Sequence, residues 1–435
     1  ICRPIVKHAV MVERVEDLPA LLVEAFARAE SGRPGPVLLD VPKDVQQASL
    51  EIDRASFADR PPPLAASMFA SVAQLERCQQ LLAAAERPVL YVGGGVVQAA
   101  AHEGARALAE RQQLPVVSSL MGLGCFPAEH PLHLGMLGMH GAPFTNHLLR
   151  EADLLFAIGV RFDDRATGKL AEFCPNAQTI HVDIDRREIG KLRRVELGIQ
   201  SDTRSFLESL LPLMAAKERP CWLARMRELR TLHPLPSASS SSAPALLRAL
   251  GRVLDPDTAI TTDVGQHQMW VAQHLPIARP RRLLTSGGLG TMGFGLPAAI
   301  GAALETGGRA LCISGDGSLL LNIQELATLA ELDLDVTILL FDNQHLGLVR
   351  QQQVLFYERR ICASRFERPT DFVAVARAFG LNAESWSLPN DPFSRLERLL
   401  ERRGPQLIHV PLDAAEMVLP MVPPGAANHE MLGEH

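Results

Sequence analysis

Short runs of apolar residues alternate with longer helical patterns through most of this sequence. Examples are "RPVLYVGGG" (87–95), "ADLLFAIGV" (152–160) and "VTILLFDN" (336–343). Strands that are apolar at every position are buried on both faces, and the helices between them cover those faces. The alternation therefore predicts an α/β fold of parallel sheets flanked by helices. In such sheets ligands bind beyond the carboxyl ends of the strands, where this sequence concentrates Gly and Asp.

Two breaks divide the chain into three segments. "DRPPPLAAS" (59–67) contains three consecutive prolines, and "HPLPSASSSSAP" (233–244) has the Ser/Pro composition of a connection. We expect domains at 1–58, 67–230 and 245–435. The first segment reads as a strand, an amphipathic helix near 16–30 and the strand "PVLLDV". We interpret it as the end of a domain whose other part precedes Ile1; the alternative is a small self-contained αβ unit.

Composition narrows the classes of function. The net charge is −6 and aromatic residues make up 5% of the chain, so we expect no nucleic-acid partner. No apolar run reaches the roughly 18 residues that a membrane span needs, so we expect no membrane partner. The seven cysteines are scattered without a CxxC pair, which indicates a reducing compartment and neither zinc nor disulfides. We predict a cytoplasmic location.

"ISGDGSLLLN" (313–322) places an acidic residue between two glycines just after an apolar strand. Asn343 follows the next apolar strand, 27 residues after Asp316, which is the length of one β-α-β crossover. Neighbouring parallel strands would bring the two side chains to one edge of the sheet. Their oxygens suit Mg²⁺, which could carry a diphosphate. We expect a helix to start near Asn322. Taken singly, a helix cap for Asp316 and a turn for Asn343 are the ordinary alternatives.

GDG followed by asparagine at this spacing is the thiamine diphosphate signature. The chain also contains the further stretches "SGRPGPVLLDVPKD", "GMLGMHG", "RFDDRATGKL", "TTDVGQHQMW" and "SGGLGTMGFGLPAAIGA". Together they resemble the catalytic large subunits of the acetolactate synthase (acetohydroxyacid synthase) family over nearly the whole chain. The resemblance implies a Rossmann-like central domain and a thiamine diphosphate-binding domain that ends in a C-terminal lid.

The resemblance also assigns residues around thiamine diphosphate. Asp316 and Asn343 would bind Mg²⁺ through their side chains and His345 through its carbonyl. Gly290 would meet the aminopyrimidine, and Met292 would wedge beneath the cofactor. The residues expected around the diphosphate are Gly265, Gln266, His267, Gly315, Gly317 and Ser318. "GLGTMG" (288–293) also matches the GxGxxG pattern of NAD sites, but no acidic residue follows with that role.

The middle segment resembles the FAD-binding domain of the same family. "YVGGGV" (91–96) is a strand that runs into three glycines, which could bring backbone amides to a phosphate. The residues matching flavin contacts are Arg33, Gly93, Gly94, Leu137, Met139, His140, Arg161, Asp183 and Asp202. Asp164 and Arg165 match positions near the substrate channel. An empty Rossmann-like domain is the structural alternative.

The implied reaction decarboxylates pyruvate and joins the two-carbon unit to a second 2-keto acid, in branched-chain (isoleucine and valine) amino acid biosynthesis. The implied partners are a second copy of the chain, in a homodimer or tetramer, and a small regulatory subunit. The family's activating glutamate lies in an N-terminal pyrimidine-binding domain, and no stretch here matches its motif. We therefore expect this fragment to catalyse little alone.

Gln352 departs from the family pattern, which usually has tryptophan there. We therefore expect that the enzyme, restored to full length, would show a weak preference for 2-ketobutyrate as the second keto acid. Two other functions stay open. One is a different thiamine enzyme, of the pyruvate oxidase or glyoxylate carboligase type. The other is an inactive remnant that only docks to an intact subunit.

Overall fold

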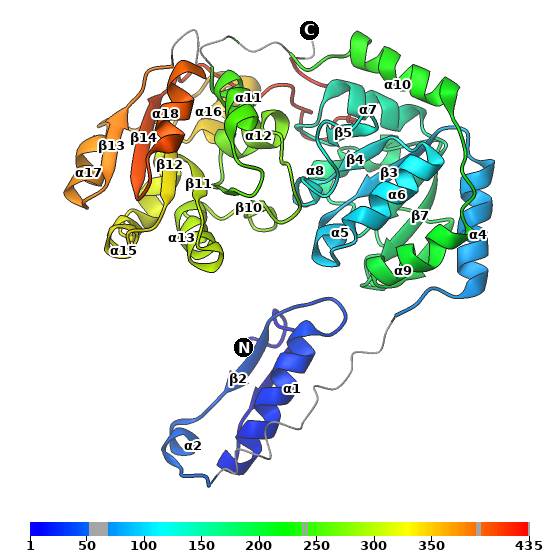
Figure 1. The fold of residues 1–435 in the computed structure, drawn as a ribbon, viewed down its shortest axis with the longest axis horizontal. Helices are drawn as coiled ribbons and strands as arrows, with labels where there is room; N and C mark the ends of the chain where they lie inside the picture. Colours follow the sequence, from blue (N-terminus) through cyan, green and yellow to red (C-terminus); the bar gives the residue numbers. More distant parts are fainter. Residues whose placement is uncertain (52–67, 237–238, 240–241, 389–392, 434–435) are drawn as a thin grey trace.

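The computed structural model describes residues 1–51, 68–236, 239, 242–388 and 393–433. The whole of the proline-rich break (59–67) lies outside this range, and the serine-rich break lies partly outside it. Two six-stranded parallel sheets form the body of the molecule, and a two-stranded parallel sheet belongs to residues 1–51 (Figure 1). No helix within the described residues is long and apolar enough to cross a bilayer.

The central sheet has the strand order β5-β4-β3-β6-β7-β8. Its strands are β3 (Pro88–Val92), β4 (Val116–Ser118), β5 (His133–Met136), β6 (Leu154–Ile158), β7 (Gln178–Asp183) and β8 (Leu197–Gln200). The chain starts in the middle at β3, builds outward to β5, and returns to build the other half from β6. This doubly wound order opens a crevice at the carboxyl ends of β3 and β6.

Helices cover both faces of the central sheet. One face packs against α4 (Val72–Ala84), α6 (His102–Gln112) and α9 (Thr203–Leu210), and the other against α7 (Pro143–Glu151) and α10 (Pro220–Leu232). Alternate residues of β3 point to the two faces: Leu90 and Val92 join the first core, and Val89 and Tyr91 the second. A strand with two buried faces reads as continuously apolar, as the sequence does here.

The C-terminal sheet has the order β10-β9-β11-β12-β14-β13. Its strands are β9 (Ala259–Thr262), β10 (Leu283–Thr285), β11 (Ala310–Gly315), β12 (Val336–Asp342), β13 (Asn382–Ser385) and β14 (Gln406–Pro411). Here the winding direction changes between β9 and β11. The crevice of this sheet is therefore expected where those two strands end.

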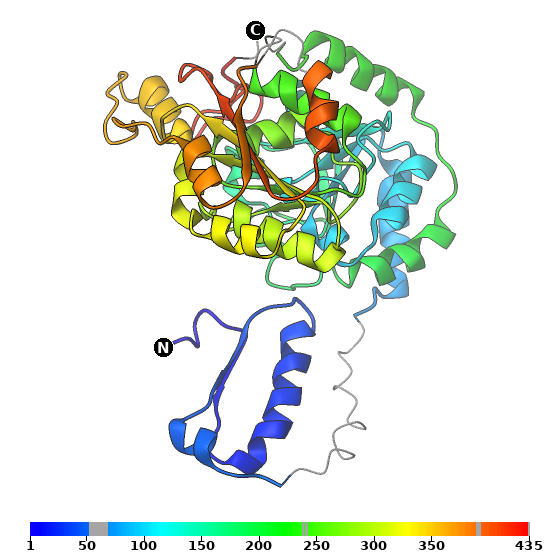
Figure 2. The same ribbon diagram turned by 60° about the vertical axis from the view of Figure 1, so that its left-hand side comes forward.

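The C-terminal sheet is also sandwiched between helices (Figure 2). One face carries α11 (Ala243–Val253), α12 (Gln266–His274) and α18 (Phe393–Glu401), and the other carries α13 (Gly295–Thr306), α15 (Glu325–Glu331) and α17 (Phe372–Ala378). α16 (Gly347–Phe356) follows β12. Residues that follow strands of both sheets line one cavity, so these strand ends face the region between the two sheets.

Two segments lie outside the sandwiches. Residues 1–51 form β1 (His8–Met11), α1 (Leu18–Glu30), β2 (Val37–Asp40) and the short helix α2 (Lys43–Gln47), with β1 parallel to β2. Arg33 from the loop after α1 forms ion pairs of 3.2 Å with Asp185 and Glu188 of the central domain. The C-terminal tail after β14 runs back to the central domain, where Val422 N donates to Met139 O.

The structure departs from the expected elements in two ways. A helix does start near the expected position, since α15 begins at Glu325, but the short helix α14 (Asp316–Leu319) that precedes it, with a 3-10 turn (Leu320–Asn322) between them, was not expected. Asp316 therefore occupies the first turn of a helix.

The strands β5, β8 and β13 were not expected from the sequence. β8 and β13 are short edge strands with exposed or polar positions, so they lack the apolar run that marks the inner strands.

Candidate functional site

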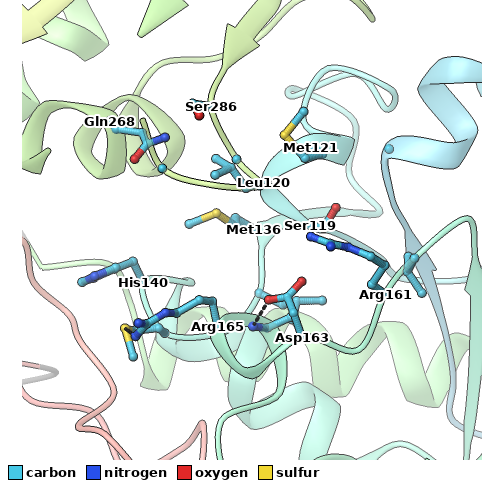
Figure 3. A pocket seen from close by; sticks show the side chains of 18 of the residues that line it. Ser119, Leu120, Met121, Met136, His140, Arg161, Asp163, Arg165, Gln268 and Ser286 are labelled. Atoms are coloured by element: carbon cyan, nitrogen blue, oxygen red, sulfur yellow. Dashed lines mark hydrogen bonds between the residues drawn. The ribbon is translucent and has the colours of Figure 1, made fainter. Parts of the chain in front are cut away.

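A cavity of about 680 Å³ lies between the two large sheets (Figure 3). The central domain supplies one wall, including Met136, His140 and Arg161, and the C-terminal domain supplies the other, including Gln268 and Ser286. A volume of this size is typical of small-molecule and cofactor sites. The walls come from the ends of strands, where α/β folds place their ligands.

Close backbone contact forms the floor of the cavity at the ends of β3 and β6. A Cβ atom on Gly95 would lie 2.6 Å from the Cα of Gly159, and a Cβ on Gly93 would collide with the Gly159 carbonyl oxygen. Gly159 itself has a φ of +59°, which favours glycine. The glycines of "YVGGGV" thus let the two strand ends approach each other, a packing role that holds whether or not a phosphate binds.

Most of the residues predicted to contact flavin surround this one cavity. The structure places on its wall Arg33, Gly94, Leu137, Met139, His140, Arg161 and Asp183. Two others are not on the wall. Gly93 packs against Gly159, and Asp202 caps α9, where its Oδ1 accepts a hydrogen bond of 3.0 Å from Ser205 N. Their ligand roles stay predictions.

Two acidic residues near Arg33 differ in their electrostatics. Burial raises the pKa of Asp183 to about 6. The hydrogen bond from Arg187 holds the pKa of Asp185 well below its usual range, and Arg33 adds a second hydrogen bond of 3.2 Å. The cavity therefore has one carboxyl group, on Asp183, that is close to half-protonated in weakly acidic solution.

The predicted metal residues come together at the ends of β11 and β12. These strands are parallel neighbours, with Gly315 opposite Phe341. Asp316 is 5% exposed; its Oδ1 accepts from Gly317 N at 2.7 Å, and its Oδ2 is buried without a hydrogen-bond partner. Asn343 lies in the loop after β12, where its Oδ1 accepts from His345 N at 3.1 Å. His345 is in the same loop.

The environment of Asp316 fits a cation. Burial, together with the nearby Asp342, raises the pKa of Asp316 to about 7. A buried carboxylate oxygen without a partner is costly unless a positive group meets it. A carboxylate, an amide and a main-chain carbonyl are also the hard oxygen donors that Mg²⁺ prefers. In the described part of the chain, no cluster of three or more His, Cys, Asp or Glu side chains could hold a metal.

The residues predicted around the diphosphate adjoin this metal position. Gln266 Oε1 accepts from Asn343 Nδ2 at 2.9 Å. His267 lies under the glycine turns, because a Cβ on Gly315 would come within 3.0 Å of its ring. Burial lowers the pKa of His267 to about 4, so the ring is neutral at pH 7. Ser318 Oγ donates to Val264 O at 2.9 Å, which ties the short helix α14 to the turn after β9. Gly317 lies in α14, and Gly265 lies in the turn after β9.

Asp263 was not predicted from the sequence, and it anchors a loop that borders the cavity. It is 1% exposed, and its carboxylate accepts from Gly293 N at 2.8 Å and from Gly295 N at 3.2 Å. These bonds fix the loop that carries Gly290 and Met292. Gly290 lines the main cavity, whereas Met292 is half-buried and does not. The signal available in the sequence was an acid directly after an apolar strand, as for Asp316.

Gln351 is a second residue that the sequence reasoning missed. It is 1% exposed on α16 and lines the cavity. Its side chain clamps the C-terminal tail, since Oε1 accepts from Val418 N at 2.8 Å and Nε2 donates to Val418 O at 3.0 Å. Gln266 Nε2 also lies 3.2 Å from Gln351 Oε1. The predicted diphosphate residues and the tail are therefore linked through two amide side chains.

The predicted substrate-channel residues differ in placement. Gln352 is exposed and lines the cavity. Arg165 also lines it, and its Nη1 approaches Met139 Sδ at 3.4 Å. Figure 3 shows Arg165 near His140 and Asp163 on one side of the cavity. Asp164 is exposed and does not line the cavity.

Two family models match the chain, and their limits agree with the two large sheets. Residues 75–210 match the central domain of thiamine pyrophosphate enzymes. Residues 263–410 match their C-terminal TPP binding domain. The first match covers the central sheet from α4 to α9, and the second covers the sheet that carries Asp316 and Asn343.

Curated relatives match almost the whole chain. The chain is 50% identical over 436 positions to "Acetolactate synthase isozyme 1 large subunit" of Escherichia coli K12, covering 99% of this chain and 76% of the relative. It is 42% identical to the isozyme 2 large subunit of the same organism, covering 98% and 77%. It is 39% identical to "Acetolactate synthase 1, chloroplastic" of Nicotiana tabacum, covering 100% and 68%. The chain therefore belongs to the acetolactate synthase large-subunit family of thiamine pyrophosphate enzymes.

Proposed function

We propose that the chain serves in an enzyme that decarboxylates pyruvate and joins the two-carbon unit to a second 2-keto acid, in the synthesis of branched-chain amino acids. The family's cofactors are thiamine diphosphate, Mg²⁺ and FAD. The observation that carries the assignment is the buried, unpartnered Oδ2 of Asp316 beside Asn343 at the ends of neighbouring strands. Family membership and the chemistry of this oxygen set support the same reading.

In this proposal Asp316, Asn343 and the carbonyl of His345 hold Mg²⁺. Around the diphosphate lie the turns after β9 and β11, with Gly265, Gln266, His267, Gly315, Gly317 and Ser318. When bound, thiamine diphosphate supplies the electron sink that allows a 2-keto acid to lose CO₂. The neutral ring of His267 suits a position under the turns, because it adds no charge next to the cation.

The loop held by Asp263 and the C-terminal tail shape the cavity and help to exclude water from it. Asp263 holds the loop of Gly290 and Met292 against the C-terminal sheet through main-chain hydrogen bonds. The tail, clamped by Gln351, helps close the cavity, because Met421 is part of its lining. Water exclusion protects a reactive carbon from protonation before the second keto acid arrives. We assign Gln352 and Arg165, which both line the cavity, to the entry of that acid.

The FAD assignment rests on the central crevice. Its position at the switch point between β3 and β6 is where dinucleotides bind in this topology. Gly94 and Arg161 lie beside that point, and Asp183 lies at the end of the neighbouring β7. We assign FAD a structural role in the main reaction, which transfers no net electrons. The matched bacterial relatives are named large subunits, which supports a small regulatory subunit as a partner. A homodimer or tetramer is the assembly that we propose for the chain itself.

The test is Mg²⁺-dependent binding of thiamine diphosphate, measured by calorimetry on the chain. We expect Asp316→Asn to weaken binding at least 100-fold, because the amide keeps the shape but loses the charge. Glu331→Gln, at an exposed carboxylate on α15, is the matched control and should bind like the unaltered chain. Equal binding by Asp316→Asn would remove the metal assignment.

Product analysis of the active enzyme then distinguishes acetolactate synthesis from the reactions of a pyruvate oxidase or a glyoxylate carboligase.

A further inference from the structure

A series of hydrogen-bonded side chains crosses the neighbouring strands β13, β14 and β12 toward the predicted metal position (Figure 1). Ser385 Oγ lies 3.0 Å from His409 Nδ1, and His409 Nε2 lies 2.8 Å from Asp342 Oδ2. His409 is paired with Leu340, two residues before Asp342, so the His409 and Asp342 side chains lie on the same face of the sheet. None of the three hydrogen-bonded residues is among those predicted to bind Mg²⁺ or the diphosphate.

The partners of His409 fix the direction of its hydrogen bonds. An ionised carboxyl group only accepts, so His409 Nε2 donates to Asp342 Oδ2. A hydroxyl group can donate, so Ser385 Oγ–H satisfies Nδ1 of the neutral ring. The ring also packs against the Phe372 ring, with 6.4 Å between the centroids. The side chains of His409 and Asp342 are 18% and 8% exposed, so the bond between them is largely shielded from water.

The other oxygen of Asp342 holds the loop that follows β12. Asp342 Oδ1 accepts from Gln344 N at 3.0 Å. Gln344 has a φ of +56°, a left-handed conformation that is unfavourable for a residue other than glycine. A carboxylate that bonds the main chain two residues further on stabilises a turn of this kind. Asn343 and His345, which are predicted to bind Mg²⁺, flank Gln344, so their orientation depends on a turn that Asp342 stabilises.

The same turn adjoins Asp316, the remaining residue predicted to bind the metal. Gln344 N lies near the Asp316 carboxylate, and the carboxyl groups of Asp316 and Asp342 are close enough to interact. Both oxygens of Asp342 are engaged, one by Gln344 N and the other by His409. Asp342 is therefore committed to holding the loop, whereas Asp316 remains the carboxylate available to a cation.

We propose that Asp342 and His409 are positioning residues for the Mg²⁺ site of the proposed function, on which this inference rests. His409 fixes Asp342, and Asp342 fixes the turn at Gln344. This turn presents Asn343 Oδ1 and the His345 carbonyl. Removing a group that holds metal ligands without touching the metal commonly lowers metal affinity by about 10- to 100-fold. The pair acts by fixing geometry and not by adding charge.

A fixed loop favours Mg²⁺ over a larger cation. Mg²⁺ requires nearly ideal octahedral coordination, whereas Ca²⁺ accepts longer and more variable distances. Loosening the turn should therefore weaken binding supported by Mg²⁺ more than binding supported by Ca²⁺. A variant that merely destabilises the fold would weaken both to the same extent, so the ratio of the two affinities reports on positioning.

The test measures thiamine diphosphate binding by calorimetry on the chain, once with Mg²⁺ and once with Ca²⁺. Asp342→Ala removes both hydrogen bonds, and we expect it to weaken binding about tenfold with Mg²⁺ and no more than about threefold with Ca²⁺. Asp342→Asn keeps an oxygen for Gln344 N, and its amide can donate to His409 Nε2 once the ring proton moves to Nδ1. We expect Asp342→Asn to bind like the unaltered chain with both cations.

Variants of His409 test the same role without altering the loop. His409→Leu removes the donor to Asp342 and should lower the ratio of Mg²⁺ to Ca²⁺ affinity about threefold, even where Asp342→Ala does not fold. His409→Gln keeps an N–H donor near the position of Nε2 and should restore the ratio. Asp255→Ala is the matched control, because Asp255 Oδ1 accepts from Asp257 N at 2.8 Å in an exposed turn before β9. It should change neither affinity.

The outcomes distinguish this inference from the proposed function. An unchanged affinity ratio in both Asp342→Ala and His409→Leu would overturn the positioning role, even if Asp316→Asn still abolishes Mg²⁺-dependent binding. Asp342→Asn binding as weakly as Asp342→Ala would also overturn it, because charge and not geometry would then matter. Binding by Asp316→Asn equal to that of the unaltered chain would overturn the proposed function, and this inference with it.

Discussion

The two large sheets share a parallel architecture but build their crevices differently. At the ends of β3 and β6 the chain uses glycine, and main chain touches main chain at Gly95 and Gly159. At the ends of β9 and β11 it uses buried acids, Asp263 and Asp316, which are 1% and 5% exposed. The first crevice is defined by shape, and its polar groups lie on the surrounding wall. The second is defined by charge, which must be met by main-chain N–H groups or by a cation.

The sharpest test of the shape-defined crevice is Gly95→Ala. The new Cβ would lie 2.6 Å from Gly159 Cα, and backbone on both sides cannot yield. We expect a loss of about 3 kcal/mol in the free energy of unfolding, measured by urea denaturation. Gly301→Ala is the control: it lies in α13, with nothing within 4 Å of the new Cβ, and should gain up to about 1 kcal/mol. Similar effects from both variants would contradict the close-contact role.

Asp263→Asn probes the charge-defined crevice. The amide cannot accept at both positions, so at least one N–H of Gly293 or Gly295 loses its partner. We expect a loss of about 2 kcal/mol in the free energy of unfolding, together with weaker thiamine diphosphate binding because the Gly290 loop loosens. Binding and stability both equal to those of the unaltered chain would show that the loop does not depend on Asp263.

His274 is buried where the two sheet domains meet, and we expect it to make the free energy of unfolding depend on pH. Burial lowers its pKa to about 4 in the folded chain, whereas an unfolded histidine titrates near 6.5. The unfolded state then binds more protons between those values, so stability falls as the pH drops through this window. We expect His274 to account for a loss of about 1–2 kcal/mol between pH 7 and pH 5. Denaturation curves of His274→Gln should show a shallower pH dependence, and an unchanged slope would rule out this contribution.

Gln352→Trp tests the wall between the two crevices and carries the smallest expected effect. 2-Ketobutyrate has one methylene more than pyruvate, and an aromatic wall favours such a group by about 1–2 kcal/mol. We expect the preference for 2-ketobutyrate to be weak with Gln352 and to rise about tenfold in the variant. A competition assay with both keto acids, on the active enzyme, measures the ratio. A strong preference in the unaltered enzyme would contradict the sequence-based prediction.

The sequence predicts the inner strands of both sheets well, because a strand buried on both faces leaves a continuous apolar run. It does not predict β8 or β13, whose edge positions need no such run. Asp316 and Asn343 were found because one crossover separates them. Asp263 and Gln351 escaped notice because their partners are main-chain groups of distant segments, and single-sequence patterns do not encode those contacts.

The tail after β14 is fastened at both ends of its path. Gln351 grips Val418 on the C-terminal side, and on the central side Val422 N, Ala426 O and Asn428 Nδ2 bond to main-chain groups of residues 139–169. The tail therefore crosses the interface between the central and C-terminal domains and is hydrogen-bonded to both. Separating the two domains would require breaking these hydrogen bonds of the tail. Cleavage within the tail should therefore weaken the domain interface while leaving each sheet folded.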